Sequence, residues 1–244
     1  MITIIGVGHV FDIKDQVREI VLAEMPGAVC VELDQDRYNA LLHPEQRRTA
    51  PPTYRILSKF QRRLAEQFGG ELGSEMLAAV NAAQEISVPA LFVDANASAL
   101  FDQLTKAMPF RERVLLFVSA ISGLFASRKR VESELEQFSE NEEQYLKEFE
   151  KQFPTLKKVL IDDRNQVMAS NLDQAEAQHG SVVAVVGDGH VQGLSSILAN
   201  HQLKVIRLKA LRSGDYRKDI GKAMEGNAEV NFQFDVAYGA QQSS

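Results

Sequence analysis

Two histidines occupy matching positions in two near copies of one short motif. The copies are Ile-Ile-Gly-Val-Gly-His-Val, which contains His9, and Val-Val-Gly-Asp-Gly-His-Val, which contains His190. Neutral imidazole is the commonest metal ligand in proteins and the usual acid–base group near neutral pH. The repeat therefore predicts a shared site that contains both histidines.

The residues around each histidine predict the same local structure. Each copy is typical of a buried strand that ends in a tight turn and continues as a helix. Ligand sites of open parallel sheets lie just beyond the carboxyl ends of the strands. If both strands belong to one sheet, the two histidines share one edge of it. The other histidines, His43, His179 and His201, lack this setting and are expected at the surface.

Two carboxylates, Glu32 and Asp34, follow the second expected strand in the run Val-Glu-Leu-Asp. If the strand extends that far, alternation places both carboxylates on one face and the leucine between them on the other. Beside His9 they could bind a divalent cation or act as a general base. In the alternative, Glu32 is structural and bonds to Arg37 or to a backbone amide at the edge of the sheet.

Further polar residues open expected helices. Glu75 follows a glycine-rich turn, and Asp163 and Arg164 begin a helix in the run Ile-Asp-Asp-Arg-Asn. The helix dipole favours an acid in the first turn, and an arginine there could hold a carboxylate in a bidentate pair. Each residue has a structural explanation of its own, but the N-termini of these helices and the ends of the strands together could surround one pocket.

The Gly-x-Gly turns also invite comparison with a dinucleotide-binding fold, which has an acid at the end of its second strand. That fingerprint requires a third glycine, in the pattern G-x-G-x-x-G. Phe11 occupies this position in the first copy and Gln192 in the second, where Gly193 comes one place late. The sequence therefore disfavours a nicotinamide or flavin cofactor.

The composition limits the class of protein. Of the 244 residues, 45% are hydrophobic and 25% are charged, which is enough apolar material for a substantial core. A net charge of −6 argues against nucleic acid binding, because such proteins normally present a basic face. The one cysteine, Cys30, lies in an apolar run and is expected to be a buried thiol in a reducing compartment.

The sequence predicts a soluble, cytoplasmic protein. The chain shows no basic segment followed by a signal-type apolar core at its start. Its most apolar stretch, residues 114–125, is too short for a membrane span, which needs about twenty residues.

The elements that would position these residues alternate between strands and helices. Strands are expected near residues 2–7, 28–33, 88–93, 182–187 and 204–208, and 230–238 could add an edge. Strand, helix and strand within about thirty residues predict parallel pairing with a right-handed crossover. We expect a single α/β domain over 1–244, with a central, mostly parallel sheet and helices on both faces.

A long helical insertion, about 98–155, interrupts this alternation. Pro109 divides it, and the apolar run 114–125 could be buried inside the monomer or against a second copy. The glutamate-rich segment 128–151 is typical of a solvated helix, or else forms an arm for a partner. We expect a possible homodimer through this insertion, because homo-oligomers are mostly twofold symmetric.

Six short motifs form a recognisable set. They are Gly6-x-Gly-His9, Val31-Glu-Leu-Asp-x-x-Arg37, Phe60-Gln-Arg-Arg-Leu-Ala, Gly73-x-Glu-Met76, Asp163-Arg-Asn-x-x-Met168-Ala and Val185-Val-Gly-x-Gly-His190-x-x-Gly193. Over about residues 2–208 the chain resembles the TraB/PrgY family, which belongs to a wider group with the GumN and Tiki proteins. One departure follows the third expected strand, where Asp94-Ala-Asn-Ala lacks an arginine that many relatives carry.

The resemblance implies peptide pheromone shutdown for the bacterial members and a proposed metal-dependent peptidase activity for the wider group. By position, it implies three metal ligands: His9, Glu32 and His190. It also implies a catalytic site made of Glu32 with three supporting residues: Arg37, Glu75 and Arg164. Histidine and carboxylate ligands suit Zn, Mn and Co alike.

Two functions are compatible with these residues. The leading one is a metal-dependent hydrolase acting on peptides, whose bound cation would polarise a carbonyl and lower the pKa of a coordinated water. Without a His-Glu-x-x-His helix, a zincin is excluded. The alternative is a non-catalytic regulator that binds a peptide or partner protein, motivated by the charged insertion and the missing arginine near Asp94.

Overall fold

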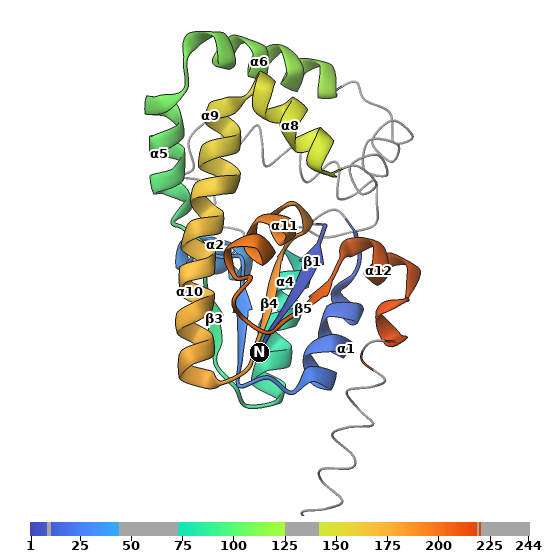
Figure 1. Ribbon diagram of the computed structural model, residues 1–244. Coiled ribbons are helices and arrows are strands. Elements are labelled where there is room, and N and C mark those ends of the chain that lie inside the picture. The colour runs from blue at the N-terminus through green and yellow to red at the C-terminus, as the bar shows by residue number, and fades with distance from the viewer. Residues whose placement is uncertain (9–10, 44–72, 125–141, 219, 221–244) are drawn as a thin grey trace, which may run out of the picture.

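A five-stranded sheet forms the centre of the protein, seen in a computed structural model that describes residues 1–8, 11–43, 73–124, 142–218 and 220 (Figure 1). Its strands are β1 (Ile2–Val7), β2 (Ala28–Val31), β3 (Ala90–Phe92), β4 (Val182–Gly187) and β5 (Leu203–Ile206). The strands are all parallel, in the order β3-β2-β4-β1-β5. The prediction of a mostly parallel α/β sheet is confirmed.

Helices cover both faces of the sheet, which explains why its central strands are apolar throughout. One face carries α1 (Lys14–Glu24) and α4 (Ser74–Glu85), and the other carries α10 (Asp163–His179) and α11 (Asp188–Ile197). Successive side chains of a strand point to opposite faces. Ile5 accordingly packs in the layer of α1 and α4, whereas Ile4 packs in the layer of α10 and α11.

The central strands leave no room for solvent. Every residue of β1, β2 and β4 is buried, as expected for a sheet covered on both sides. Cys30 on β2 is fully buried, and burial raises the pKa of its thiol to about 12. The prediction of a buried cysteine is confirmed.

Two short helices flank the sheet. They are α2 (Gln35–Leu42), which follows β2, and α12 (Leu208–Ser213), which follows β5. Tyr216, just after α12, is fully buried and donates its hydroxyl to Glu19 of α1 at 2.6 Å. This contact fastens the end of the described chain to the first helix.

A second group of helices lies beyond the carboxyl edge of the sheet (Figure 1). We call α5 (Ala97–Ala107), α6 (Phe110–Leu124), α8 (Glu142–Gln152) and α9 (Pro154–Lys157) the upper helices. They share a small core of Met108, Phe153 and Leu156. A π-helical turn, Lys158–Asp162, then joins α9 to α10. Among the helices in the described ranges, none is long and apolar enough to cross a membrane.

The structure differs from the expected boundaries at four elements: β2, β3, α11 and β5, which covers Leu203–Ile206 instead of 204–208. Strand β2 ends at Val31 instead of Leu33, because Asp34 already caps α2 by accepting the backbone N–H of Arg37 at 2.7 Å. The strand therefore does not extend far enough for alternation to place Glu32 and Asp34 on one of its faces. Strand β3 covers only Ala90–Phe92, and α11 begins at Asp188, before the histidine. The expected edge strand 230–238 lies outside the described residues.

The apolar run that begins at Val114 lies on α6 and is exposed over its described part. Val114, Leu115, Leu116, Phe117 and Val118 all have at least 37% of their surface accessible. Burial of this run inside the monomer, one of its two expected places, is contradicted for these residues. Pro109 does separate α5 from α6, as predicted.

Candidate functional site

Three strands that precede the predicted site residues end beside one another. Strand β4 lies between β1 and β2, and the register pairs Val7 with Gly187 and Val31 with Val185. His190 follows β4 on the first turn of α11, and Glu32 follows β2. His9 lies outside the described residues. The strands that lead into the two glycine–histidine motifs therefore end at the same edge, as the sequence predicts.

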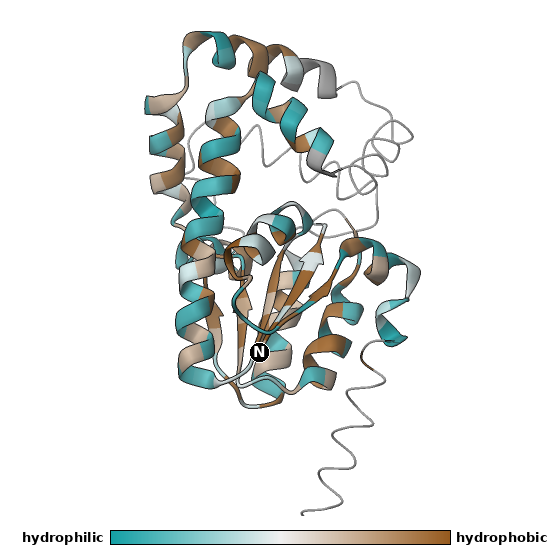
Figure 2. Ribbon diagram, viewed as in Figure 1, coloured by the Kyte–Doolittle hydropathy of each residue, from teal (hydrophilic) through white to brown (hydrophobic). Residues whose placement is uncertain are grey.

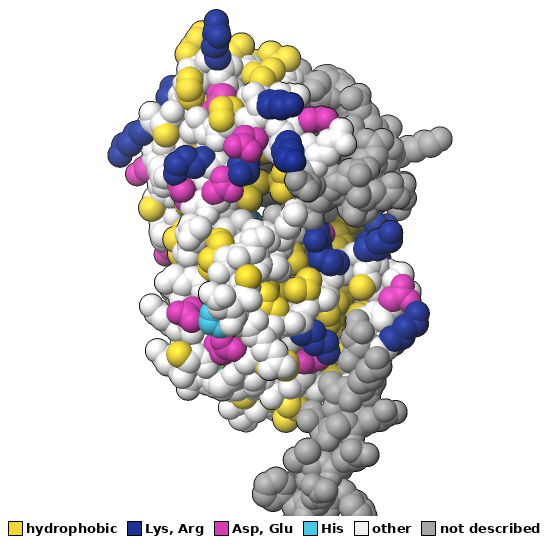
Figure 3. All heavy atoms as spheres, viewed as in Figure 1, with side chains coloured by type: hydrophobic (Ala, Val, Ile, Leu, Met, Phe, Trp, Pro, Cys, Tyr) yellow, Lys and Arg dark blue, Asp and Glu magenta, His cyan; other side chains and the backbone are white. Residues whose placement is uncertain are grey.

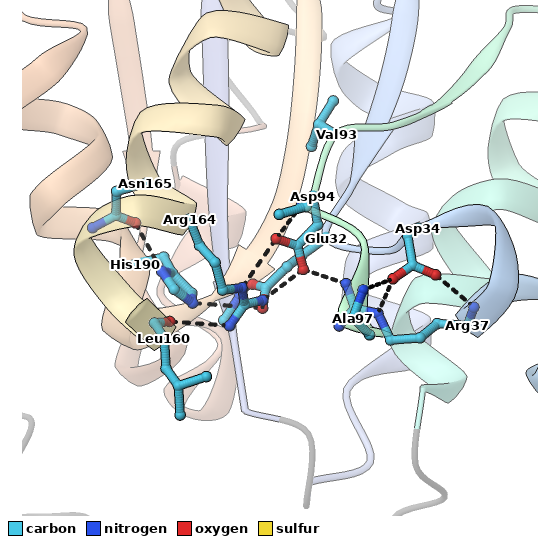
Figure 4. A network of polar contacts seen from close by, with 12 residues as sticks. Glu32, Asp34, Arg37, Val93, Asp94, Ala97, Leu160, Arg164, Asn165 and His190 are labelled. Atoms are coloured by element: carbon cyan, nitrogen blue, oxygen red, sulfur yellow. Dashed lines mark hydrogen bonds and ion pairs between the residues drawn. The ribbon is translucent and has the colours of Figure 1, made fainter. Parts of the chain in front are cut away.

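At this edge, the Glu32 side chain contacts residues of β4, α10 and α11. Its carboxylate accepts the backbone N–H of Gly187 and forms an ion pair with Arg164 (Figure 4). The Nε2 atom of His190 lies 3.6 Å from the Oε1 atom of Glu32. Both side chains are buried, with residue exposures of 5% for Glu32 and 7% for His190. The bond to a backbone amide is the structural role that the sequence left open for Glu32.

Arg164 joins Glu32 to a second acid. Its Nε and Nη2 atoms donate to the two carboxylate oxygens of Asp94 at 3.0 and 2.7 Å, and Nη1 donates to the carbonyl of Leu160 at 3.2 Å. Burial alone would lower the pKa of Arg164, but the negative charges of Glu32 and Asp94 outweigh it and raise the pKa above its usual value. The bidentate pair expected for this arginine is therefore present, with Asp94 as its partner.

Asp94 forms ion pairs with two arginines, Arg164 and Arg37. It directly follows Val93 at the end of the β3 segment, and its carboxylate also binds Arg37 of α2. Arg37 reaches Asp34 as well, with Nε 3.2 Å from Oδ2. From the sequence, Asp94 was identified only as the place of a missing arginine, and its role in these ion pairs was not predicted. The available signal was an acid directly after a strand of the same parallel sheet.

Asn165 fixes the protonation pattern of His190. The Nδ1 atom of the ring lies 2.7 Å from Oδ1 of Asn165. An amide oxygen only accepts hydrogen bonds, so Nδ1 carries the proton and the lone pair of neutral His190 is on Nε2, the atom that faces Glu32. Gly193 permits this arrangement, since a Cβ there would lie 2.2 Å from Nδ2 of Asn165. Asn165 belongs to one of the sequence motifs, but no role was predicted for it.

These contacts form one continuous group, which we call the rim cluster. Its members are Glu32, Asp34, Arg37, Asp94, Arg164, Asn165 and His190 (Figure 4). With neutral His190, three carboxylates face two guanidinium groups and leave one net negative charge. The cluster combines a basic imidazole nitrogen, a carboxylate beside it and a buried cation. This combination suits proton transfer, cation binding and stabilisation of an oxyanion.

The structure thus brings together four of the predicted site residues: Glu32, Arg37, Arg164 and His190. Glu75 is completely buried in the first turn of α4, which packs on the opposite face of the sheet from α10 and α11. The turn that leads into α4 is close to α2, because a Cβ on Gly73 would meet the side chain of Leu41.

The donor set offers part of a metal site. His190 Nε2 and Glu32 Oε1 point toward each other, and the surplus negative charge of the rim cluster favours a cation. Arg164 competes for the same Glu32 oxygen. In the described part of the chain, no three His, Cys, Asp or Glu side chains are grouped as a metal site. His190 and Glu32 therefore fit as two of the three implied ligands, and His9 is not among the described residues.

Comparison with known proteins places this arrangement in a family. An uncharacterized protein of Methanocaldococcus jannaschii is 29% identical over 206 residues, which make up 79% of this chain and 52% of that protein. The chain thus spans about half the length of that relative. The sequence pattern of the TraB/PrgY/gumN family matches residues 1–207, which include the whole sheet and the rim cluster. The chain belongs to the TraB/PrgY/gumN family.

Proposed function

We propose that the rim cluster is the active site of a metal-dependent hydrolase that acts on peptides. The observation that carries the proposal is the position of His190, whose Nδ1 binds Asn165 and whose Nε2 lies 3.6 Å from Oε1 of Glu32 at the carboxyl edge of the sheet. Ligands of open α/β sheets bind at this edge. The divalent cation would be held by His190 and Glu32, with His9 as the third ligand. When bound, it would polarise a carbonyl and supply a nucleophilic water near neutral pH.

The chain's own residues have distinct tasks in this proposal. Glu32 either binds the cation as a ligand or, as a general base, accepts a proton from the attacking water. Arg164 keeps the Glu32 carboxylate ionised and presents a fixed positive charge to the oxygen of the scissile carbonyl. Arg37 neutralises Asp94 from the other side, so that Arg164 remains available to Glu32.

Metal titration followed by a peptide cleavage assay tests the proposal. Purified protein is stripped of metal, titrated with Zn, Mn and Co, and incubated with a mixed peptide library. We expect His190→Ala to lose metal uptake and cleavage. His201→Ala serves as the matched control, because His201 binds Glu176, away from the rim cluster. Unchanged metal uptake in His190→Ala would remove His190 from the metal site.

A non-catalytic regulator that captures a peptide or partner protein is the second candidate. One observation favours it: both oxygens of Glu32 are already engaged, by Arg164 and by the backbone of Gly187. Under this function the rim cluster holds the strand ends in place and forms the floor of a recognition surface. Stoichiometric peptide binding without turnover, at every metal tested, would favour the regulator.

A further inference from the structure

Helix α6 lies at the end of the molecule farthest from the sheet (Figure 1) and contains many hydrophobic residues (Figure 2), several of which are exposed. The exposed fractions are 79% for Phe110, 46% for Val114, 66% for Phe117 and 56% for Val118. Figure 3 shows hydrophobic side chains gathered at this end, with basic groups among them. Contiguous apolar surface of this kind is typical of an interface.

The spacing of these residues indicates what covers them. Phe110, Val114 and Phe117 follow one another in steps of four and three, and the sequence continues the same steps with Ile121 and Leu124. This is the heptad pattern of a helix that packs along a narrow line against another helix. We call Phe110, Val114 and Phe117 the α6 seam.

On the side of α6 opposite the seam, Glu112 contacts the rest of the protein. Glu112 is 6% exposed and accepts the backbone N–H of Thr155, at the start of α9, at 2.9 Å. In a heptad with the seam at positions a and d, Glu112 falls at f, directly opposite the seam. The seam therefore points away from the body of its own chain.

We propose that a second copy of this chain covers the α6 seam, with the two helices packed antiparallel across a twofold axis. A twofold interface joins the same patch of both copies, and this seam is self-complementary in that sense. Phe117 is the middle residue of α6 (Phe110–Leu124), and the apolar steps of the sequence extend seven residues from it in each direction. The interface is separate from the rim cluster, and its test does not depend on the proposed hydrolysis.

Charge selects the antiparallel arrangement. Arg111 and Arg113 flank the seam on either side, both in the first turn of α6. A parallel pair would place these arginines against their own copies. An antiparallel pair places the arginines of the two copies at opposite ends of the interface, which removes this repulsion between like charges. Arg113 is also held in place by the carbonyls of Thr105 and Met108.

Sedimentation and light scattering across a concentration series test the association. The full chain should pass from monomer to dimer between about 1 and about 100 micromolar, as expected for a short helical interface. Val114→Glu should weaken the dimer at least tenfold, and Phe117→Ala should weaken it to a smaller extent. Leu115→Glu is the matched control, because it makes the same change on an exposed neighbour outside the seam.

Two results would overturn the proposed dimer. One is a monomer at every concentration, including a monomer that instead binds anionic lipid vesicles through Phe117. The other is a Leu115→Glu variant that dissociates as readily as Val114→Glu. Circular dichroism of each variant shows whether the fold is intact, and Phe117→Ala carries the test if a glutamate variant unfolds.

Disulfide cross-linking tests the orientation. Phe117→Cys lies at the middle of α6 and should form an intermolecular disulfide on mild oxidation. Phe110→Cys should not, because an antiparallel pair holds the two copies of this residue at opposite ends of the interface. Cys30 is buried and does not interfere. Equal cross-linking of Phe110→Cys and Phe117→Cys would overturn the antiparallel arrangement.

Discussion

Asn165 determines which ring nitrogen of His190 is available for chemistry, although it would touch neither metal nor substrate. The amide oxygen accepts a hydrogen bond from Nδ1, and Gly193 leaves space for the Asn165 side chain. Groups that orient a histidine ligand in this way commonly contribute a factor of 10 to 100 in metal affinity or activity. Asn165 is thus a positioning residue of the rim cluster.

Replacing Asn165 tests this role. In Asn165→Ala the imidazole can carry its proton on either nitrogen, so we expect metal affinity to fall by about 10- to 100-fold. Asn165→Asp keeps the acceptor and should retain most of the affinity. Asn171→Ala is the control, because Asn171 lies on the same helix but donates to the carbonyl of Val93. Nitrogen NMR shifts of His190 report the tautomer directly, and unchanged shifts in Asn165→Ala would refute the positioning role.

A second prediction concerns the stability that Arg164 contributes. Arg164→Met would leave two buried carboxylates, Glu32 and Asp94, without their shared cation. Removing one partner of a buried ion pair typically costs about 3–5 kcal/mol of stability. Arg18→Met is the matched control, because Arg18 pairs with Glu85 through two nitrogens at the surface, where such pairs contribute about 0–1 kcal/mol.

Urea unfolding of the Arg164→Met and Arg18→Met variants measures both costs. A loss in Arg164→Met no larger than in Arg18→Met would mean that water already solvates the carboxylates of Glu32 and Asp94 in the folded protein.

The sequence located part of this site and could not locate the rest. Glu32, Arg164 and His190 were identifiable because each opens or closes an element, and parallel sheets bring such positions to one edge. The partners were not identifiable in the same way. Asp94 binds arginines 57 and 70 residues away, and nothing in the local sequence of any of the three specifies that contact. Ion pairs of this kind depend on how α2 and α10 pack beside β3.

At the scale of elements, hydrophobic patterning predicted the ranges of two fully buried strands, β1 and β4, correctly. The uninterrupted apolar runs of β1 and β4 allow one interpretation only, and both strands match their predicted ranges closely. Patterning was less informative where a side chain caps a neighbouring helix, as Asp34 does at the end of β2. For α6 it could not decide between the protein's own core and a partner, because apolar composition is the same in both cases.

The contact between α1 and the segment after α12 should make the stability of the folded protein depend on pH. Hydrogen bonds from Arg217 and Tyr216 lower the pKa of Glu19 below its usual 4.5. Burial, reinforced by Glu19, raises the pKa of Tyr216 from 10.0 to about 12. The lowered pKa of Glu19 contributes stability above pH 4.5 that is lost as the pH falls further. The raised pKa of Tyr216 contributes stability below pH 10 that is lost between pH 10 and about 12.

Thermal unfolding as a function of pH measures this contact. We expect Tyr216→Phe to flatten the decline in melting temperature between pH 10 and about 12. Tyr145→Phe should leave the decline as it is, because Tyr145 is exposed. If the alkaline decline of Tyr216→Phe matches that of the unaltered protein, the hydroxyl of Tyr216 is not the group responsible.

At the scale of the whole molecule, the upper helices and the sheet divide the proposed activities between them. The rim cluster lies at the carboxyl edge of the sheet, and the α6 seam lies at the far end of the upper helices (Figure 1). Two copies joined through α6 would therefore keep their rim clusters well apart. The single domain and the cytoplasmic location remain predictions from the sequence.

The order of strands in the sheet has a consequence for how the protein folds during synthesis. Strand β4 lies between β1 and β2, although about 150 residues separate β2 from β4 along the chain. The first two strands of the nascent chain therefore cannot pair with each other in the native way, and they must wait for β4 to leave the ribosome. Such distant pairing is slow, because closing a long loop costs entropy before any contact forms. Glu32 consequently meets Arg164 and His190 only after β4 and α11 have been synthesised, so a nascent chain that stops before α11 carries an incomplete site.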